Sequence, residues 1–252
     1  MEERPSSHHS NSPTRPGTAS GTGNRAQEDD LNDIALPPLQ IGDEAPNFTC
    51  DSNIGLITLH DLIDGNWSVI ITFPKDFDPV STTEIGQISK MMEEFEGRNV
   101  TVLGLSPDNK PNHRAWIEDV QELQDCTVNF PILADVTGEV NQMYGLVRPK
   151  AIDPLKSLVE CSAIFLIDID KRIRMMQHYP AVTGRNFYEI LRAIDAIQLS
   201  TFHQVATPSN WRQGEDVLIP SNISSAAANS IFPKGFLEIK DWFRLTPQPD
   251  ID

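Results

Sequence analysis

Asp78 and Ser81 are the two side chains whose types and spacing first suggest chemistry, and Pro79 lies between them. A serine hydroxyl acts as a nucleophile when a general base, usually a histidine, removes its proton and a carboxylate orients that base. Residues 73–84 contain no histidine, and the chain has no Gly-x-Ser-x-Gly motif. Asp is favoured at the N-cap of a helix and Pro at its first position. We therefore expect Asp78 and Ser81 to cap a helix rather than to form a hydrolase site.

The three cysteines, Cys50, Cys126 and Cys161, are the other candidate reactive groups. They are widely spaced and odd in number, so they form neither a Cys-x-x-Cys motif nor a metal-binding cluster, and they favour a reducing compartment. Cys50 and Cys126 have no evident fixed cationic neighbours. Cys161 and Ser162 are neighbours in a predicted strand, so their side chains should point to opposite faces of the sheet. We expect incidental thiols, with no metal and no cofactor.

The chain is strongly acidic, with 36 acidic against 20 basic residues and a formal net charge of -16. Affinity for nucleic acids comes largely from lysine and arginine that neutralise phosphates, so we expect no nucleic-acid partner. No apolar run approaches the roughly 18 residues of a membrane helix, and the N-terminus resembles neither a secretory signal nor an acid-poor transit peptide. We therefore expect a cytoplasmic protein without integral membrane association.

Alternating strand-like and helix-like segments must position the candidate residues. Residues 68–73 and 100–105 are apolar and β-branched, as in buried strands. Between them Ile85, Ile88, Met92 and Phe95 recur at helical spacing, which predicts a helix from residue 79 to about residue 96. Further helices are expected over residues 112–123 and from residue 187, and a strand over residues 163–167. This pattern predicts an α/β domain over residues 37–200.

The two ends of the chain differ from this domain in composition. Residues 1–36 are rich in Ser, Pro, Gly and charge and have almost no large apolar side chains, so we expect a disordered tail in which His8 and His9 are solvated. Residues 201–252 carry many prolines and turns with short apolar runs. They are expected to form a small C-terminal domain of strands and loops.

Residues 73–84 resemble the reactive loop of the 1-Cys (peroxiredoxin-6) subfamily of the peroxiredoxins, which reads His-Pro-Arg-Asp-Phe-Thr-Pro-Val-Cys-Thr-Thr-Glu. The matching residues are Pro74, Asp76, Phe77, Pro79, Val80, Thr82, Thr83 and Glu84. Similar blocks occur at residues 42–48, 178–187, 205–208, 232–235 and 245–249. The resemblance implies an antioxidant family with a thioredoxin-like α/β fold, in which helices flank a central mixed sheet. It also implies a small C-terminal peroxiredoxin domain at residues 201–252, and usually a dimer.

The chain departs from the family where the family has its reacting groups. Ser81 stands at the position of the peroxidatic cysteine, Asp78 at that of a threonine, and Ser162 at that of an arginine on a neighbouring strand. Phe73 and Lys75 replace the histidine and the arginine of the loop. A hydroxyl cannot follow the sulfenic-acid route of a thiolate, and a nearby carboxylate would raise the pKa of any thiolate. The resemblance therefore predicts a pseudoenzyme that has lost its thiol peroxidase activity.

Pro74, Glu84 and Arg185 remain from the pocket of the family. We expect Glu84 and Arg185 to orient the helix ends and a loop that faces the dimer partner. Arg185 is also suited to holding an anion in a vestigial pocket.

Two classes of function follow from the resemblance. The first is a non-catalytic binding or dimerising protein, which forms a homodimer or a heterodimer with an active peroxiredoxin. The second is an enzyme, with either residual hydroperoxide reduction through another thiol or a weak phospholipase A2-like activity. For the latter the family uses a histidine, a serine and an aspartate. The equivalent positions are His60, Asn66 and Asp170, and Ser68 lies two residues from the serine position.

Overall fold

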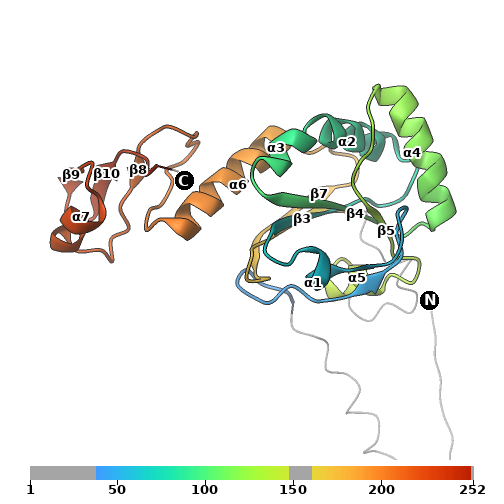
Figure 1. The fold of residues 1–252 in the computed structure, drawn as a ribbon, viewed down its shortest axis with the longest axis horizontal. Coiled ribbons are helices and arrows are strands. Elements are labelled where there is room, and N and C mark those ends of the chain that lie inside the picture. Colours follow the sequence, from blue (N-terminus) through green and yellow to red (C-terminus); the bar gives the residue numbers. More distant parts are fainter. Residues whose placement is uncertain (1–37, 148–160, 251–252) are drawn as a thin grey trace, which may run out of the picture. The chain divides into compact units, whose positions relative to one another are not determined.

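The computed structural model describes residues 38–147 and 161–250, and its main feature is a five-stranded sheet with helices on both faces (Figure 1). The tail expected at residues 1–36 lies outside the described residues. The elements, in chain order, are β1 (Thr49–Cys50), β2 (Ile57–Thr58), α1 (Leu59–Leu62), β3 (Trp67–Thr72), α2 (Pro79–Lys90), α3 (Met92–Glu96), β4 (Val100–Ser106), α4 (Lys110–Gln124), β5 (Ile132–Ala134), α5 (Glu139–Met143), β6 (Cys161–Ile167), β7 (Ile173–Pro180), α6 (Phe187–Phe202), β8 (Val217–Leu218), α7 (Ser225–Ile231), β9 (Leu237–Lys240) and β10 (Phe243–Thr246).

The sheet has the strand order β5-β4-β3-β6-β7. Strands β3, β4 and β5 are parallel, whereas β6 pairs antiparallel with β3 and β7 antiparallel with β6. Strand β3 is central, so Ile70 lies beside Leu103 on one side and Phe165 on the other. This arrangement confirms the prediction of a central mixed sheet flanked by helices.

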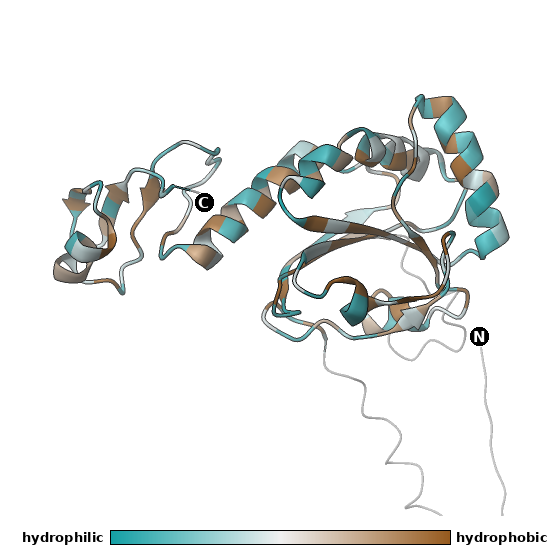
Figure 2. Cartoon of the chain, in the orientation of Figure 1, coloured by the Kyte–Doolittle hydropathy of each residue, from teal (hydrophilic) through white to brown (hydrophobic). Residues whose placement is uncertain are grey.

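Alternate side chains of the strands pack into two separate cores, as expected for a sheet that is covered on both faces. Val69 and Ile71 belong to the core beneath α2, α4 and α6, and Ile70 belongs to the core beside α1 and α5. All three side chains are fully buried. Figure 2 shows the corresponding hydrophobic colouring along the strands of the sheet.

The prediction of one continuous helix from residue 79 to about residue 96 is wrong, because the segment forms two helices, α2 and α3. Met91 leaves the helical conformation (φ -109°, ψ 10°), and its N–H bonds to the carbonyl of Ile88, three residues back. The chain turns there and begins α3. The predicted apolar face is nevertheless confirmed, since Ile88, Met92 and Phe95 are buried in the same core.

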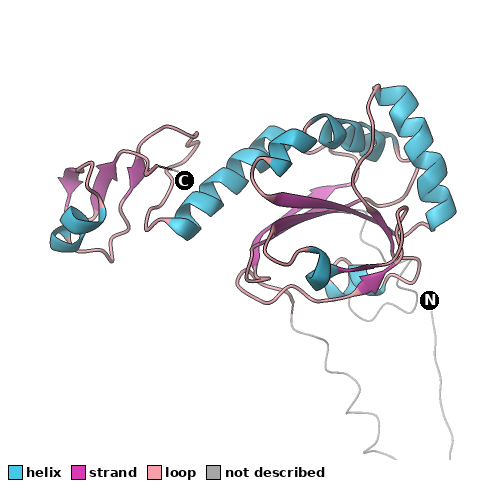
Figure 3. Ribbon diagram, in the orientation of Figure 1, coloured by secondary structure: helices cyan, strands magenta, loops and turns pink. Residues whose placement is uncertain are grey.

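The C-terminal segment forms a separate, three-stranded antiparallel sheet of order β8-β10-β9 (Figure 3). Its small core includes Trp211 and Val217, and Ala196 and Leu199 from α6 belong to the same cluster. Helix α7 was not predicted. It begins at Ser224, whose hydroxyl accepts a hydrogen bond from the N–H of Ala227. None of the helices within the described residues is both long and apolar enough to cross a membrane.

The buried hydroxyl of Ser68 predicts a stabilising substitution. Ser68 is 0% exposed, and its Oγ has no hydrogen-bond partner among the described residues. An unpaired buried hydroxyl costs about 1–3 kcal/mol, so we expect Ser68→Ala to raise the free energy of unfolding by about 1 kcal/mol in urea titrations.

Thr72 provides the matched control on the same face of β3. Its Oγ1 accepts a hydrogen bond of 2.9 Å from the N–H of Ala163. Thr72→Val should therefore lower the free energy of unfolding by about 1–3 kcal/mol, because it leaves a buried donor unpaired. A loss of stability in Ser68→Ala comparable to that in Thr72→Val would contradict the assignment.

Candidate active site

Asp78 and Ser81 form a closed cap at the N-terminus of α2. Asp78 has an extended conformation (φ -83°, ψ 130°), and Pro79 is the first helical residue. One carboxylate oxygen, Asp78 Oδ2, accepts hydrogen bonds of 2.8 Å from both the N–H and the hydroxyl of Ser81. Ser81 is 1% exposed. The capping role predicted for these two residues therefore agrees with the geometry, and the hydroxyl donates to the capping carboxylate rather than to a histidine.

A buried polar network fixes the loop that leads into this cap. Asp76 accepts hydrogen bonds from the hydroxyl of Ser106 at 2.7 Å, and His113 Nδ1 lies 2.6 Å from its other carboxylate oxygen. His113 Nε2 lies 3.2 Å from the carbonyl of Leu133. The network joins the loop to β4, α4 and β5, and Asp76, Ser106 and His113 are all buried.

Phe77 has a left-handed backbone between Asp76 and the cap. Its φ is 56°, which is unfavourable for a bulky residue, and its side chain is about half exposed. Such conformations cost about 1–3 kcal/mol and persist only where the surroundings impose them. Here the buried side chain of Asp76 on one side and the helix cap at Asp78 on the other impose the conformation.

Glu84 and Arg185 form a buried ion pair beside the cap. Glu84 Oε1 accepts hydrogen bonds of 2.8 Å from the backbone N–H and from Nε of Arg185, and Oε2 accepts one from Nη2. Arg185 Nη1 donates to the carbonyl of Ala163 at 3.0 Å. The arginine side chain is 0% exposed. Arg185 thus joins α2 to β6 and to the start of α6, and it does not face solvent as an anion site would.

Aromatic packing fills the space around this ion pair. The Cζ atom of Arg185 lies 5.3 Å from the centre of the Phe73 ring, within the range of a cation–π contact. Phe73 packs edge-on against Trp116 with ring centres 5.8 Å apart, and Trp116 Nε1 donates to Thr82 Oγ1 at 2.9 Å. Phe73 is 3% exposed. The residue is therefore part of the core and supplies no acid or base.

The remaining residues singled out from the sequence add no buried charge to the site. Ser162 is buried in β6, next to Ala163, and brings no charge to the site. Pro74 lies half-buried in the loop after β3, and Lys75 is exposed. The site therefore has Arg185 as its buried cation, and Glu84 neutralises that charge.

Burial disfavours the thiolate forms of two of the three free cysteines. Burial, together with the charge of Asp135, raises the pKa of Cys50 to about 11. Burial also raises the pKa of Cys161, and the charge of Arg185 partly offsets that effect. Cys161 packs in the core on the face of the sheet opposite α2, as the strand pattern predicted. Cys126 is partly buried against the other core.

The positions equivalent to the family's phospholipase residues do not form a catalytic arrangement. His60 Nε2 is within 2.8 Å of the carbonyl of Ala45, and Ser68 is completely buried. Among the described residues no hydrogen bond joins His60, Ser68 and Asp170. No group of three or more potential metal ligands occurs within residues 38–147 and 161–250.

His113 is the site residue that the sequence analysis missed. Asp76 belonged to the matching loop, but nothing in the sequence linked it to a histidine 37 residues further on. The available signal was the position of His113 near the start of a predicted helix. Which loops lie beside a histidine at that position can be said only when the order of the strands is known.

Two family models match the chain. The AhpC/TSA family matches residues 41–176, and the C-terminal domain of 1-Cys peroxiredoxin matches residues 196–231. A 1-Cys peroxiredoxin of Dictyostelium discoideum is 41% identical over 212 residues, which cover 84% of this chain and 86% of that protein. Peroxiredoxin-6 of Gallus gallus is 38% identical over 224 residues, which cover 85% of this chain and all of the relative.

Two solved structures are similar in fold and sequence. The yeast mitochondrial 1-Cys peroxiredoxin superposes with a TM-score of 0.77 at 38% identity and covers 83% of this chain and 99% of that structure. A cysteine-to-serine mutant of the peroxiredoxin 6 of Arenicola marina superposes with a TM-score of 0.76 at 37% identity. The match covers 84% of this chain and 100% of that structure.

The Asp78 cap predicts different effects for two substitutions. Asp78→Ala removes the acceptor for the Ser81 N–H, and we expect the free energy of unfolding to fall by about 1 kcal/mol. Asp78→Asn keeps an acceptor oxygen in place and should cost less than about 0.5 kcal/mol. Urea unfolding of both variants measures the difference. Equal losses in the two variants would show that the negative charge, rather than the hydrogen bond, stabilises the helix end.

Proposed function

Because this chain belongs to the AhpC/TSA family of peroxiredoxins and is of the 1-Cys, peroxiredoxin-6 type, we propose that it is a non-catalytic member of that family. In this proposal Ser81 stands where its active relatives carry the peroxidatic cysteine. The observation that carries the proposal is the closed Asp78–Ser81 cap at the first turn of α2.

The chemistry of serine supports loss of the peroxidase reaction. In that reaction a thiolate attacks one peroxide oxygen, the O–O bond breaks, and the sulfur becomes a sulfenic acid that thiols later reduce. A serine oxygen has no such oxidation route and is a weak nucleophile without a base. The nearest side-chain partner of Ser81 Oγ is Asp78, which accepts its proton in a hydrogen bond.

The electrostatics around Ser81 also oppose a reactive anion. The carboxylate of Asp78 already occupies the N-terminus of α2, where the unpaired N–H groups and the helix dipole favour negative charge. Arg185 is engaged by Glu84 and by the carbonyl of Ala163. Ser162 provides no second cation. A peroxide in this position would meet a resident carboxylate, and the buried Arg185 is already neutralised by Glu84.

The two enzymatic alternatives have less support. Reduction of hydroperoxides through another thiol is disfavoured at Cys50 and Cys161, because burial raises the pKa of both groups. Phospholipase A2-like activity is disfavoured because Ser68 is fully buried and its hydroxyl has no hydrogen bond to His60 or to any other described residue. Both activities remain outcomes that the assays below would reveal.

We propose a dimer as the working form, since the non-catalytic role requires a binding partner. The loop after β7 exposes Val182, which is 86% exposed. A side chain at Gly184 would meet Val80 of α2, so this loop lies against the first turn of α2. The edge strand β9 also exposes Leu237 and Ile239. Apolar surface of this kind favours association with a second copy, or with an active peroxiredoxin of similar shape.

For its location we propose the cytoplasm. The low, odd cysteine count is typical of a reducing compartment. One similar protein, from yeast, is mitochondrial.

A repair series tests the loss of peroxidase activity. The unmodified chain should not reduce hydrogen peroxide or a lipid hydroperoxide in the presence of excess thiol. Ser81→Cys alone should restore little activity, because Asp78 raises the pKa of the new thiol and Ser162 adds no cation. The combination of Ser81→Cys, Asp78→Thr and Ser162→Arg should restore measurable turnover. Full activity in the single variant would contradict this account of the electrostatics.

Turnover by the unmodified chain would contradict the proposal itself. In that case Cys50→Ser, Cys126→Ser and Cys161→Ser variants would identify the thiol responsible.

Native mass measurements test the dimer. We expect twice the monomer mass, and we expect Val182→Glu to raise the monomer fraction at micromolar concentration, because it places a charge in a buried interface. Ile54→Glu is the matched control, since Ile54 is 70% exposed and lies outside the loop and the edge strand. A monomer at all concentrations, with no mixed species after co-expression with an active relative, would refute both forms of the dimer.

A further inference from the structure

A cleft between α3 and α6 carries an unusual charge for this protein. Its volume is about 380 Å³. The residues that line this α3–α6 cleft are Lys90, Met91, Glu94, Arg98, Tyr188, Leu191, Arg192, Asp195, Arg212 and Gln213. Four of them are basic and two are acidic, although the whole chain has 36 acidic against 20 basic residues. The cleft therefore gathers four basic side chains on an acidic protein.

The acidic residues of the cleft are already engaged in ion pairs. Arg98 binds Asp195 through Nε at 2.6 Å and Nη2 at 3.1 Å, and its Nη1 donates to Glu94 Oε2 at 2.8 Å. The same contacts place α3 against α6, as Figure 1 shows. Arg192 in turn binds Glu189 through Nε at 2.6 Å and Nη2 at 2.7 Å. These carboxylates neutralise Arg98 and Arg192.

Lys90 and Arg212 are the two basic residues of the cleft whose side chains form no ion pair with another described residue. Within residues 38–147 and 161–250 neither side chain has an ion pair, and both are exposed. The nearby carboxylate of Glu215 accepts a hydrogen bond from the backbone N–H of Arg212. Lys90 ends α2, and Arg212 follows Trp211, whose carbonyl is bound by Arg192. Two cations from separate segments thus face one cavity.

The rest of the cleft suits a flat organic body. Met91 and Leu191 are buried and form apolar lining, and the ring of Tyr188 is 72% exposed at the rim. A second cavity, of about 710 Å³, shares Glu94, Arg98, Asp195 and Gln213 with the cleft. Its lining includes Trp67, whose buried indole N–H has no acceptor among the described residues. The α3–α6 cleft itself, at about 380 Å³, is large enough for more than a phosphate ion.

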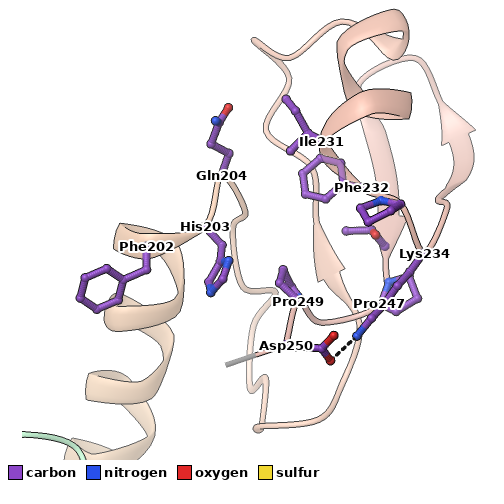
Figure 4. A pocket seen from close by; sticks show the side chains of 11 residues that line it. Phe202, His203, Gln204, Ile231, Phe232, Lys234, Pro247, Pro249 and Asp250 are labelled. Carbon is purple, nitrogen blue, oxygen red and sulfur yellow. Dashed lines mark hydrogen bonds and ion pairs between the residues drawn. The ribbon is translucent and has the colours of Figure 1, made fainter. Parts of the chain in front are cut away.

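The cavity beside the C-terminal end of α6 differs from the α3–α6 cleft, because its lysine is paired with a carboxylate (Figure 4). It is lined by Phe202, His203, Lys234 and Asp250, among others, and has a volume of about 340 Å³. Its lysine, Lys234, is paired with Asp250 within the cavity. The charge there is balanced internally, so that cavity offers no comparable site for an anion.

We propose that the α3–α6 cleft binds a small organic phosphate of the nucleoside monophosphate class. The phosphate group lies between Lys90 and Arg212, and the aromatic base lies over the apolar lining beside Tyr188. Arginine and lysine recognise phosphate through charge-assisted hydrogen bonds, and an exposed tyrosine stacks on a flat ring. The net charge of -16 repels longer polyanions, which limits the ligand to a small molecule.

Calorimetric titration of the full chain at low salt tests the proposal with adenosine 5′-monophosphate as the probe. We expect one-site binding with a Kd of about 10 µM to 1 mM, and binding at least about tenfold weaker for adenosine and for inorganic phosphate. Lys90→Gln combined with Arg212→Gln should weaken binding at least about tenfold. The matched control, Lys240→Gln, changes an exposed lysine of β9 and should leave the affinity unchanged.

Three results would overturn the proposal. They are no saturable binding by the unmodified chain at millimolar nucleotide, equal affinity in the double variant, and equal affinity for inorganic phosphate and the nucleotide. Lys90 and Arg212 are exposed, so the double variant should fold, and circular dichroism confirms this before titration. The titration does not depend on the peroxidase assay, so the proposed binding site and the proposed non-catalytic role are tested independently.

Discussion

The buried ion pair between Glu84 and Arg185 is the interaction on which the site depends. It connects α2 to the loop before α6, and through the carbonyl of Ala163 it also connects both elements to β6. Both side chains are withdrawn from water, so removing either one would leave a buried charge uncompensated, at a cost of about 3–5 kcal/mol. The pair therefore constrains the position of α2 whether or not any reaction occurs there.

The N-terminus of α2 shows how the scaffold would keep its helix cap in the proposed non-catalytic role. Unpaired N–H groups at a helix end need acceptors, and the helix dipole favours negative charge there. A reactive thiolate satisfies both requirements, and so does the carboxylate of Asp78, which binds both donors of Ser81. In the proposed role, the changes at Asp78 and Ser81 form one unit: the carboxylate replaces the charge, and the serine contributes its N–H and hydroxyl.

Local sequence signals predicted the features that depend on local physics. The spacing of Ile85, Ile88 and Phe95 predicted the buried face of the helices after β3, and the sequence around Pro79 predicted the cap. The turn at Met91 carried no glycine or proline signal, so the break between α2 and α3 was missed. Helix α7 was missed as well, because a seven-residue helix in a Pro-rich region has too few residues to show a period.

Features that require distant segments to meet could not be read from the sequence. The contact between His113 and Asp76, and the buried state of both, depend on the order of the strands. The sequence named Glu84 and Arg185 but not their direct pairing, which leaves the arginine without solvent exposure. The α3–α6 cleft likewise unites α2, α6 and the segment after α6, and no local run of basic residues predicts it.

The left-handed backbone of Phe77 has a consequence for the history of the chain. The strain at this residue lowers stability by about 1–3 kcal/mol, and glycine or asparagine would tolerate the conformation better. Where a reaction requires the loop, selection maintains such strain; once the reaction is gone, neutral substitution is free to relax it. In the proposed non-catalytic role no reaction maintains this strain, and the presence of phenylalanine here then points to a continuing use of the half-exposed ring.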